Sequence, residues 1–458
     1  MKPLSITDIA SAIGAELVGT DTGRLIRAVS TDTRSLGEGS LFVALRGDNF
    51  DGHHFVSKAV ENGAECLLLD ALPEEVEDLK VPVLLVKNSL YGLQRLAKWY
   101  RDLLDINVIG ITGSNGKTST KDFTSSVLRQ KFQVNATKGN LNNHIGLPLS
   151  VLATKETDQV CVWEMGMNHA GEIAPLCDIA SPDIGIITNV GTAHIEHLGS
   201  REGIAEEKAS LARALPENGT LIVTASCDFV DYLIERTTAK VVVTGNCRGS
   251  VRAENLQINE SGSSFDLCIE GEVPARVELN VSGRHMVNNS LLAAAAGFTL
   301  GMTVEEIAAG LNATQLTTGR LRRFVSNGIT VIDDTYNANP DSVAAAIETL
   351  TDLPVHNGNR RIVVLGMMAE LGVHADAEHL RVGQLAAEKD LQVVAVGAKA
   401  AKIYEGASAV TDKAVSFDEP VAAAEWLKSF CKEGDRVLFK GSRMAAMENV
   451  MNEAFPQT

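Results

Sequence analysis

The amino-acid sequence predicts an α/β protein of three domains: a small α/β N-terminal domain, a central domain with a doubly wound sheet, and a C-terminal Rossmann-like domain. The chain has 458 residues, and roughly 150 residues per domain gives about three domains. Apolar strand-like runs alternate with helical segments in two separate stretches, which is typical of parallel sheets covered by helices. A glycine-rich turn at residues 112–119 joins one such strand to a helix. This turn predicts a phosphate-binding loop (P-loop) in the central domain.

Residues 1–85 are expected to form the N-terminal domain. Residues 5–13 have the apolar spacing of a helix, and residues 40–45, 64–69 and 81–86 have the composition of strands. Glycine and aspartate are dense between these segments, so we expect turns to connect them.

Residues 86–314 are expected to form the central domain. Its first strand, residues 107–112, is apolar without interruption, as in a strand buried on both faces of a parallel sheet. Short alternating runs at residues 241–281 predict an antiparallel hairpin extension. The other elements are expected as helices at residues 90–104, 118–131, 202–214 and 288–301, and as strands at residues 159–163 and 183–190.

Residues 315–458 are expected to form the C-terminal domain. The turn-rich segment at residues 310–319 is interpreted as the linker that leads into it. Strand-like segments, each followed by a loop and a helix-like segment, then predict a second parallel sheet at residues 330–333, 361–365, 392–396 and 436–440.

The charge of the chain restricts its partners. Lys and Arg number 41 against 58 Asp and Glu, which gives a formal net charge of -17. An acidic chain without a dense basic patch is repelled by a phosphate backbone, so we expect no nucleic-acid partner.

The seven cysteines lie far apart and include no C-x-x-C pair, so neither a zinc cluster nor a disulfide framework is expected. This scattered distribution of cysteines indicates a reducing, cytoplasmic location. Residues 1–20 lack the basic and apolar regions of a signal peptide. The most apolar run, residues 291–302, is too short to span a bilayer, so no transmembrane segment is expected.

The strongest local motif is Thr-Gly-Ser-Asn-Gly-Lys-Thr-Ser at residues 112–119. Its glycines allow backbone N–H groups to approach phosphates, Lys117 supplies positive charge, and the Thr118 hydroxyl is placed for Mg²⁺. Ile111 stands where the strict P-loop pattern has its first glycine. The strand–loop–helix context nevertheless favours nucleotide binding over a chance match.

Glu164 and His194 each follow an apolar strand of the central domain. The carboxyl ends of parallel strands meet at the edge where the phosphate loop lies, so both side chains can reach one metal ion there. For a single Glu at a strand end the alternative is a solvated loop residue. Lys208, judged by composition alone, is an exposed helix lysine paired with neighbouring acids.

Two polar segments of the C-terminal domain also follow apolar strands. Residues 333–342 contain two acids, two asparagines and a proline, which is typical of a structural turn. Their place at the carboxyl edge of the sheet instead favours ligand binding. Residues 439–443 combine a strand end, a glycine turn and Arg443, which suits an anion or a carboxylate.

These motifs resemble those of the Mur ligase family along the whole chain. The two C-terminal segments resemble the branch that adds D-alanyl-D-alanine to UDP-N-acetylmuramoyl-tripeptide more than its sister ligases. The similar segments are residues 30–34 and 42–53, then 112–119, 138–148, 164–173 and 283–289, and finally 334–342 and 440–448.

The resemblance implies an ATP-dependent, ADP-forming amide ligase. Its partners would be UDP-N-acetylmuramoyl-tripeptide and D-alanyl-D-alanine, joined through an acyl phosphate to give the pentapeptide precursor of peptidoglycan. The resemblance also implies Mg²⁺ as a cofactor and a carbamylated Lys208, and we expect a monomer. A sister Mur ligase, a folylpolyglutamate synthetase-like ligase and a P-loop nucleotide switch are the alternatives.

The same resemblance implies a role for particular residues. Catalytic roles are expected for Lys117, Lys208 and His194. Metal ligation is expected for Thr118, Glu164, His194 and Lys208. ATP is expected to contact Gly113, Ser114, Asn115, Gly116, Lys117, Thr118, Ser119, Asn289, Arg320 and Asp334. The substrates are expected to contact Thr31, Asp32, Arg34, Gly47, Asn140, Asn142, Asn143, Tyr336, Asn337, Asn339, Ser442 and Arg443. The chain departs from the usual family residues at His144, Met286 and Met367.

Overall fold

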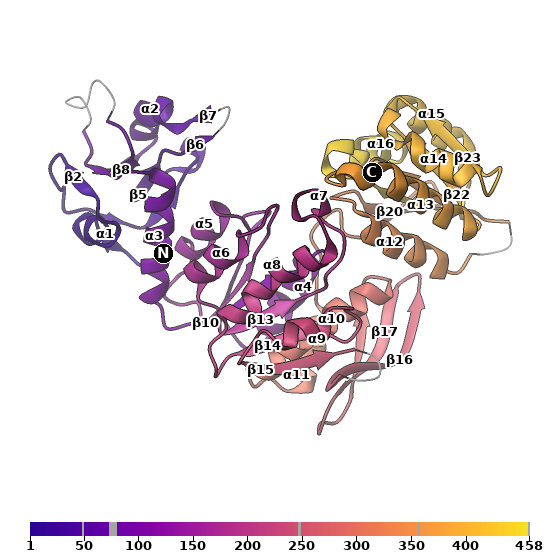
Figure 1. The fold of residues 1–458 in the computed structure, drawn as a ribbon, viewed down its shortest axis with the longest axis horizontal. Helices are drawn as coiled ribbons and strands as arrows, with labels where there is room; N and C mark the ends of the chain where they lie inside the picture. Colours follow the sequence, from indigo (N-terminus) through magenta and orange to yellow (C-terminus); the bar gives the residue numbers. More distant parts are fainter. Residues whose placement is uncertain (48–49, 73–79, 246–248, 356–357, 457–458) are drawn as a thin grey trace.

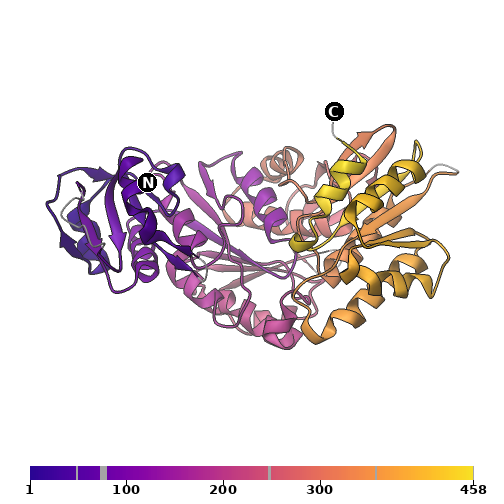
Figure 2. The same ribbon diagram turned by 90° about the horizontal axis from the view of Figure 1, so that it is seen from above.

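The computed structural model describes residues 1–458 apart from residues 48–49, 73–79, 246–248, 356–357 and 457–458. Three groups of elements follow one another along the chain, each with a sheet of its own (Figure 1). They lie in a curved row, with the N-terminal group at one end and the C-terminal group at the other (Figure 2). The predicted three-domain α/β fold class is confirmed. None of the described helices is long and apolar enough to cross a membrane.

The N-terminal elements are strands β1 (Leu4–Ser5), β2 (Glu16–Val18), β3 (Leu25–Ile26), β4 (Ala28–Ser30), β5 (Ser40–Val43), β6 (Arg46–Gly47), β7 (Phe50–Asp51), β8 (Ala64–Leu69) and β9 (Val83–Leu85), and helices α1 (Ile6–Ile13) and α2 (Val56–Glu61). The main sheet has the order β2-β9-β8-β5-β4 and is parallel except between β2 and β9. Successive residues of β5 point to opposite faces. Leu41 therefore packs in a cluster with α1, and Phe42 in a cluster with α2.

The central elements are strands β10 (Asn107–Thr112), β11 (Val134–Ala136), β12 (Val160–Glu164), β13 (Ile184–Ile187), β14 (Thr220–Thr224), β15 (Lys240–Thr244), β16 (Val251–Asn259), β17 (Gly262–Ile269) and β18 (Ala275–Leu279), and helices α3 (Ser89–Asp102), α4 (Lys117–Leu128), α5 (Gly146–Leu152), α6 (Ile173–Ala180), α7 (Ile195–Leu198), α8 (Arg201–Ala214), α9 (Val230–Ile234), α10 (Arg284–Thr299) and α11 (Val304–Asn312). The sheet order is β11-β12-β10-β13-β14-β15-β16-β17-β18. The strands from β11 to β15 are parallel, whereas β16, β17 and β18 pair antiparallel.

Strand β10 is covered on both faces, which explains its uninterrupted apolar run. Ile109 and Ile111 belong to a cluster with α4 and α10, whereas Val108 belongs to a cluster with α6 and α8. The loop after β10 therefore starts from a rigid position at the carboxyl edge of the sheet.

Two expectations for the central domain need correction. The antiparallel extension begins at β16, because residues 240–244 form β15, which pairs parallel with β14. The expected linker at residues 310–319 overlaps the end of α11. Thr303 and Glu306 form a reciprocal capping box at the start of this helix. This helix-start signal was overlooked because the segment that follows is rich in turn-forming residues.

The C-terminal elements are strands β19 (Arg322–Ser326), β20 (Ile329–Asp334), β21 (Arg361–Leu365), β22 (Gln392–Val396), β23 (Ala414–Phe417) and β24 (Arg436–Lys440), and helices α12 (Pro340–Asp352), α13 (Ala375–Glu388), α14 (Ala401–Ser408), α15 (Pro420–Phe430) and α16 (Met447–Ala454). The sheet order is β19-β20-β24-β21-β22-β23, parallel apart from the edge strand β19. The sequence did not predict the two edge strands, β19 and β23.

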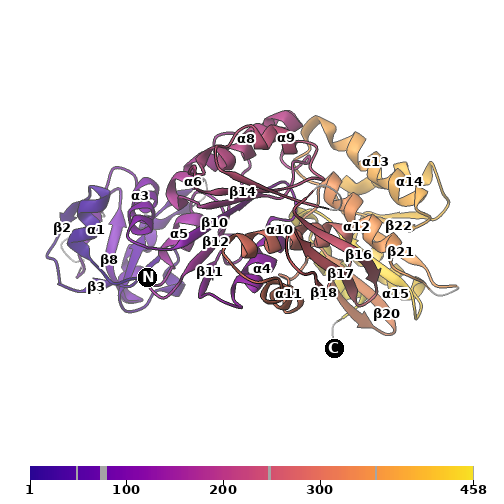
Figure 3. The ribbon, with the colours of Figure 1, turned by 90° about the horizontal axis from the view of Figure 1, so that it is seen from below.

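Helix α12 lies between the central and C-terminal domains (Figure 3). One hydrophobic cluster includes Leu291 of α10 together with Ile347 of α12. A Cβ atom at Gly283, just before α10, would lie 2.7 Å from Oγ1 of Thr349 in α12. The two domains therefore pack closely along this helix.

Helix α3 joins the N-terminal and central domains and packs on α1, α5 and α6. Near its end, the buried Arg101 donates hydrogen bonds to backbone carbonyls of the central domain. Its Nε donates to Ala180 (3.0 Å), its Nη1 to Leu104 (3.2 Å) and its Nη2 to Ser181 (3.3 Å). These carbonyls lie at the end of α6, in the residue that follows it, and just after α3.

Replacing Arg101 with Met should lower the free energy of unfolding by about 3 kcal/mol, because several carbonyls at this junction lose their donors. Urea unfolding would measure the change. Arg129→Met, at an exposed arginine after α4, is the matched control and should leave stability nearly unchanged. Equal transition midpoints for the two variants would contradict the structural role of Arg101.

Candidate active site

The loop after β10 has the geometry of a phosphate-binding loop. Gly113 and Gly116 have positive φ angles of 150° and 79°, and Gly116 immediately precedes α4. A Cβ atom at Gly113 would collide with Oγ1 of Thr188, and one at Gly116 would lie 2.6 Å from Oδ1 of Asn289. Only glycine fits these positions, so the backbone N–H groups at the start of α4 remain accessible.

The loop after β13 holds the phosphate loop in place. The N–H of Asn115 donates to Oδ1 of Asn189 (2.9 Å), and Oγ1 of Thr188 donates to the carbonyl of Asn115 (2.5 Å). The N–H of Gly191 donates to Oγ of Ser114 (2.9 Å). These bonds join two loops that lie at the carboxyl ends of neighbouring strands.

Lys117 is the first residue of α4, and its Nζ donates to the carbonyl of Gly113 at 2.7 Å. Burial lowers the pKa of this ammonium group, and the positive charge of Arg320 lowers it further, whereas Glu164 and Glu370 act in the opposite direction. The side chain therefore lies across the phosphate loop, next to the N-terminus of α4, where an anion is favoured.

Thr118 and Glu164 are close together beside the phosphate loop. Oγ1 of Thr118 donates to Oε2 of Glu164 at 3.0 Å, and Nδ2 of Asn142 donates to the other carboxylate oxygen at 2.8 Å. Both Thr118 and Glu164 are buried. Hydroxyl and carboxylate oxygens are ligands that Mg²⁺ takes. Among the described residues, no group of three or more His, Cys, Asp and Glu side chains is arranged to hold a metal ion.

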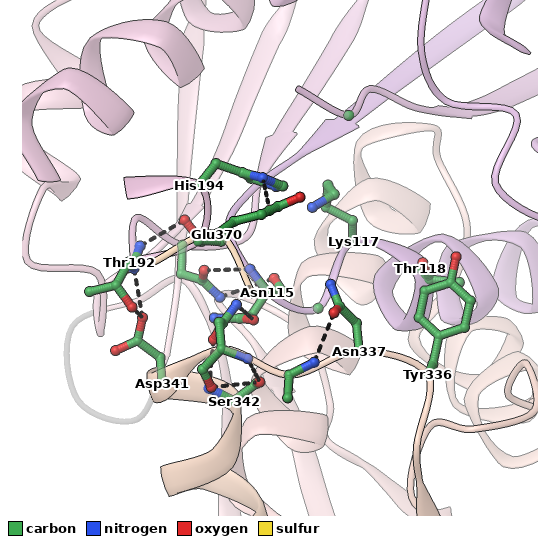
Figure 4. A pocket seen from close by; sticks show the side chains of 18 of the residues that line it. Asn115, Lys117, Thr118, Thr192, His194, Tyr336, Asn337, Asp341, Ser342 and Glu370 are labelled. Atoms are coloured by element: carbon green, nitrogen blue, oxygen red, sulfur yellow. Dashed lines mark hydrogen bonds and ion pairs between the residues drawn. The ribbon is translucent and has the colours of Figure 1, made fainter. Parts of the chain in front are cut away.

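His194 lies on the same edge but contacts the C-terminal domain. It has a positive φ angle of 63° at the start of α7. Its Nδ1 is 2.5 Å from Oε2 of Glu370, which follows β21 (Figure 4). The pKa of Glu370 is lowered, chiefly by the hydrogen bond with His194. The sequence analysis missed Glu370, which lies in the loop after β21 and not at the strand end itself, where Glu164 lies.

Lys208 is buried in α8, with 1% of its surface exposed. The prediction from composition that Lys208 is exposed is therefore wrong. Neighbouring Glu207 instead accepts hydrogen bonds from the N–H groups of Gly171 and Ile173, both at 2.7 Å. Nζ of Lys208 is 3.8 Å from Sδ of Met167. Burial lowers the pKa of Lys208 well below that of an ordinary lysine, and Lys117 adds to the effect.

The C-terminal domain contributes a second set of charged groups. Nζ of Lys440 donates to Oδ2 of Asp334 (2.5 Å) and to the carbonyl of Asn337 (2.9 Å). Arg320 donates to Oγ1 of Thr118 at 3.3 Å and lies over the ring of Tyr336, 4.1 Å from its centroid. Arg320 therefore brings a positive charge from the interdomain segment directly to the phosphate loop.

His285, near the start of α10, also faces this region, and the sequence analysis did not select it. Burial lowers the pKa of His285 to about 4, with Lys440 lowering it further and Asp334 opposing the shift. The imidazole is therefore neutral at neutral pH.

These residues surround one cavity of about 710 Å³ between the central and C-terminal domains. Figure 4 shows side chains from both domains directed into it. The expected site residues that line it are Ser114, Asn115, Gly116, Lys117, Thr118, Ser119, Asn140, Asn142, Asn143, Glu164, His194, Asn289, Arg320, Asp334, Tyr336, Asn337, Asn339, Ser442 and Arg443. His144 and Met286, two of the departures from the family pattern, line it as well.

Several expected residues do not line this cavity. Lys208 contacts Met167, which does line the cavity, and Gly113 is a residue of the phosphate loop that does not reach its wall. Four others, Thr31, Asp32, Arg34 and Gly47, belong to the N-terminal domain. Among them, Arg34 forms a bidentate ion pair with Asp32. The hydrogen bonds from Arg34 lower the pKa of the Asp32 carboxyl group to about 2.

Comparison with known proteins identifies the class. Three Mur ligase domain families match: the Mur ligase family catalytic domain at residues 25–101, the Mur ligase middle domain at residues 111–297, and the Mur ligase glutamate ligase domain at residues 319–443. The chain is 38% identical to the UDP-N-acetylmuramoyl-tripeptide--D-alanyl-D-alanine ligase of Bacillus subtilis, over 94% of this chain and 93% of the relative. It is 34% identical to the Escherichia coli ligase of the same name, over 98% of each chain. The chain belongs to the Mur ligase family.

Solved structures give the same result. A crystal structure of MurF from Acinetobacter baumannii matches with a TM-score of 0.92 and 31% identity, and covers 100% of both chains. The MurF ligase from Thermotoga maritima in complex with ADP matches with a TM-score of 0.82 and 29% identity, over 93% of this chain and 97% of that one.

Replacing Lys117 with Met should weaken ADP and ATP binding by about 10- to 100-fold, the loss expected for one hydrogen bond to a charged group. Isothermal titration calorimetry would measure it. Lys131→Met removes the same charge from an exposed lysine shortly after α4 and should leave the affinity unchanged. If both variants bind nucleotide as the unaltered chain does, Lys117 is not a phosphate ligand.

Proposed function

We propose that this protein is the ATP-dependent ligase that joins D-alanyl-D-alanine to UDP-N-acetylmuramoyl-tripeptide, with the pentapeptide precursor of peptidoglycan, ADP and phosphate as products. The observation that carries the proposal is the cavity in which a phosphate loop faces the polar strand ends of the C-terminal domain. Relatives that bear this ligase's name match over nearly the whole chain. Folylpolyglutamate synthase, at 16% identity, shares the fold alone.

The chemical problem is to form an amide from a carboxylate, whose oxygen is a poor leaving group. Transfer of the γ-phosphoryl group of ATP to that carboxylate gives an acyl phosphate, and the amine of the dipeptide then displaces phosphate. Such a transfer needs positioning and neutralisation of charge. Lys117 and Arg320 lie at the phosphate loop and carry the positive charge for this purpose.

The three substrates are assigned to different parts of the chain. ATP binds at residues 113–119, with Asn289, Arg320 and Asp334 around the rest of the nucleotide. The UDP-sugar binds the N-terminal domain, residues 1–85, through Thr31, Asp32, Arg34 and Gly47, and its peptide extends past Asn140, Asn142 and Asn143 into the central domain, residues 86–314. The dipeptide binds the C-terminal domain, residues 315–458, next to Tyr336, Asn337, Asn339, Ser442 and Arg443.

The buried oxygens of Thr118 and Glu164 fit Mg²⁺, and His194 lies on the same edge of the sheet. Mg²⁺ in such sites keeps few protein ligands and binds substrate phosphates, whose charge it offsets. Thr118 and Glu164 are the residues that would hold it here. Asn142 orients the Glu164 carboxylate toward Thr118 through its hydrogen bond.

Lys208 is proposed to be carbamylated. Its amine attacks CO₂ so that an N–C bond forms and a proton leaves to solvent, which turns a cationic side chain into an anionic one. Only the neutral amine reacts, and burial with a lowered pKa supplies it. An uncharged or anionic side chain also relieves the repulsion from Lys117.

The protein is further proposed to work in the cytoplasm as a monomer. Six described cysteines are free, and five of them are buried, which agrees with a reducing compartment. A net charge of -17 makes nucleic acid an unfavourable partner.

The ligase activity is tested by phosphate release from ATP and Mg²⁺ in the presence of UDP-N-acetylmuramoyl-tripeptide. Release should require D-alanyl-D-alanine and should yield the pentapeptide, identified by mass spectrometry. L-alanyl-L-alanine and single amino acids are the controls and should give no product. A chain that ligates a single amino acid instead would be a sister ligase, and this result would overturn the proposal.

Lys208→Ala should reduce turnover by about 10- to 100-fold, as for loss of a residue that supports a metal site. Acetate or formate should restore part of the activity by supplying the missing carboxylate, with no effect on the unaltered enzyme. Bicarbonate should activate the CO₂-depleted enzyme more at mildly alkaline pH, where the neutral amine is more abundant. A nearly fully active Lys208→Ala enzyme would contradict the assignment.

A further inference from the structure

The N-terminus of α12 contacts the two loops that form the phosphate site. Oδ2 of Asp341, in the first turn of this helix, accepts hydrogen bonds from the N–H of Thr192 at 2.7 Å and from its Oγ1 at 2.9 Å. Nδ2 of Asn339, the N-cap residue, donates to Oδ1 of Asn115 at 2.7 Å. Figure 4 shows Asp341 directed at Thr192. We call these two pairs the α12 contact.

We propose that Asp341 and Thr192 are positioning residues that couple the docking of the C-terminal domain to the geometry of the phosphate loop. The proposal rests on the ligase function proposed above. It concerns the step before phosphoryl transfer, in which the two domains that hold ATP and dipeptide come together.

The first argument is the continuity of the hydrogen bonds. Thr192 directly follows Gly191, whose N–H donates to Ser114 of the phosphate loop at 2.9 Å. The next residue of that loop, Asn115, accepts from Asn339 of the same helix that carries Asp341. The phosphate loop, the loop after β13 and α12 thus form a closed ring of hydrogen bonds. A shift of α12 must therefore change its direct contact with the phosphate loop, at Asn115, and its contact with Thr192, whose neighbour Gly191 is bonded to that loop.

The second argument is the tight packing at Gly191. A Cβ atom at this position would collide with Oδ2 of Asp341. The φ angle of Gly191 is not in the positive range that favours glycine, so the missing side chain serves the approach of α12 and not a turn. The Asp341 carboxylate therefore packs directly against Gly191, and a side chain at this position would have to displace it.

The third argument is that these side chains are already occupied. Oδ1 of Asn339 accepts from the N–H of Ser342 at 2.9 Å as the helix cap, while its Nδ2 donates to Asn115. Asn339 as a whole is only 8% exposed. Asn339 therefore takes part in the domain contact as well as lining the cavity.

A double-mutant cycle tests the pair. Asp341→Ala should lower kcat by about 10-fold or more, as expected for loss of hydrogen bonds to a charged acceptor. Its KM for the UDP-sugar tripeptide should not change, because the other two domains bind that substrate. Thr192→Val should have a smaller effect, since its backbone N–H remains. The double variant should be no worse than Asp341→Ala, and Asp341→Asn should recover part of kcat.

A steric clash that is introduced at Gly191 and relieved by truncating Asp341 gives a second test, which does not depend on turnover. Small-angle X-ray scattering with Mg²⁺ and a non-hydrolysable ATP analogue would measure the radius of gyration. Gly191→Ala should increase it by preventing docking, and should have little further effect when Asp341 is also Ala, because the colliding carboxylate is gone. Glu348→Ala, an exposed acid on the same helix, is the control and should match the unaltered chain.

Additive effects of Thr192→Val and Asp341→Ala, or an effect of Asp341→Ala confined to KM for the dipeptide, would overturn the proposal and make Asp341 a substrate contact. An unchanged radius of gyration in Gly191→Ala would overturn it as well. The scattering result does not require ligase activity. Failure of the ligation assay with the unaltered chain would therefore count against the proposed function and not against the α12 contact.

Discussion

The catalytic region depends on one constraint, the close approach of the phosphate loop to the loop that follows β13. Gly113 has no room for a side chain beside Thr188, so the two loops can exchange hydrogen bonds through Asn115 and Asn189. The conformation of the phosphate loop is therefore set by its neighbour as much as by its own glycines. This explains how the loop keeps its form although Ile111 replaces the first glycine of the strict P-loop pattern.

The same neighbouring loop carries Thr192 and His194 to the C-terminal domain, where they meet Asp341 and Glu370. The nucleotide site and the domain interface thus share one short segment, the loop that follows β13. The amines of Lys117, Lys208 and Lys440 lie around this region, and desolvation lowers the pKa of each. Desolvated amines oppose folding, because the charged form loses its hydration, so their grouping around this region is typical of a functional site.

Elements with a strong local pattern were predictable from the sequence. The uninterrupted apolar run of β10 and the spacing of α1 and α3 specify their structure without knowledge of the rest of the chain. Edge strands β19 and β23 were missed because each is paired on one side only and its alternation is weak. Helix α11 was missed for a different reason: its buried residues Val304, Ile307, Ala308 and Leu311 recur at helical spacing, but the helix runs into the turn-rich segment that was interpreted as a linker.

The sequence by itself determined many of the strands, the phosphate loop and the rule that polar residues at strand ends gather on one edge, because these follow from neighbours in the chain. That rule selected Glu164, Asp334 and Arg443, which line the cavity. Only the tertiary structure decided which side chains meet across domains. Asn339 and Asn115 are 224 residues apart, and the burial of Lys208 depends on the packing of α8 under the sheet. Such contacts arise from the fit of whole elements, and no local pattern encodes that fit.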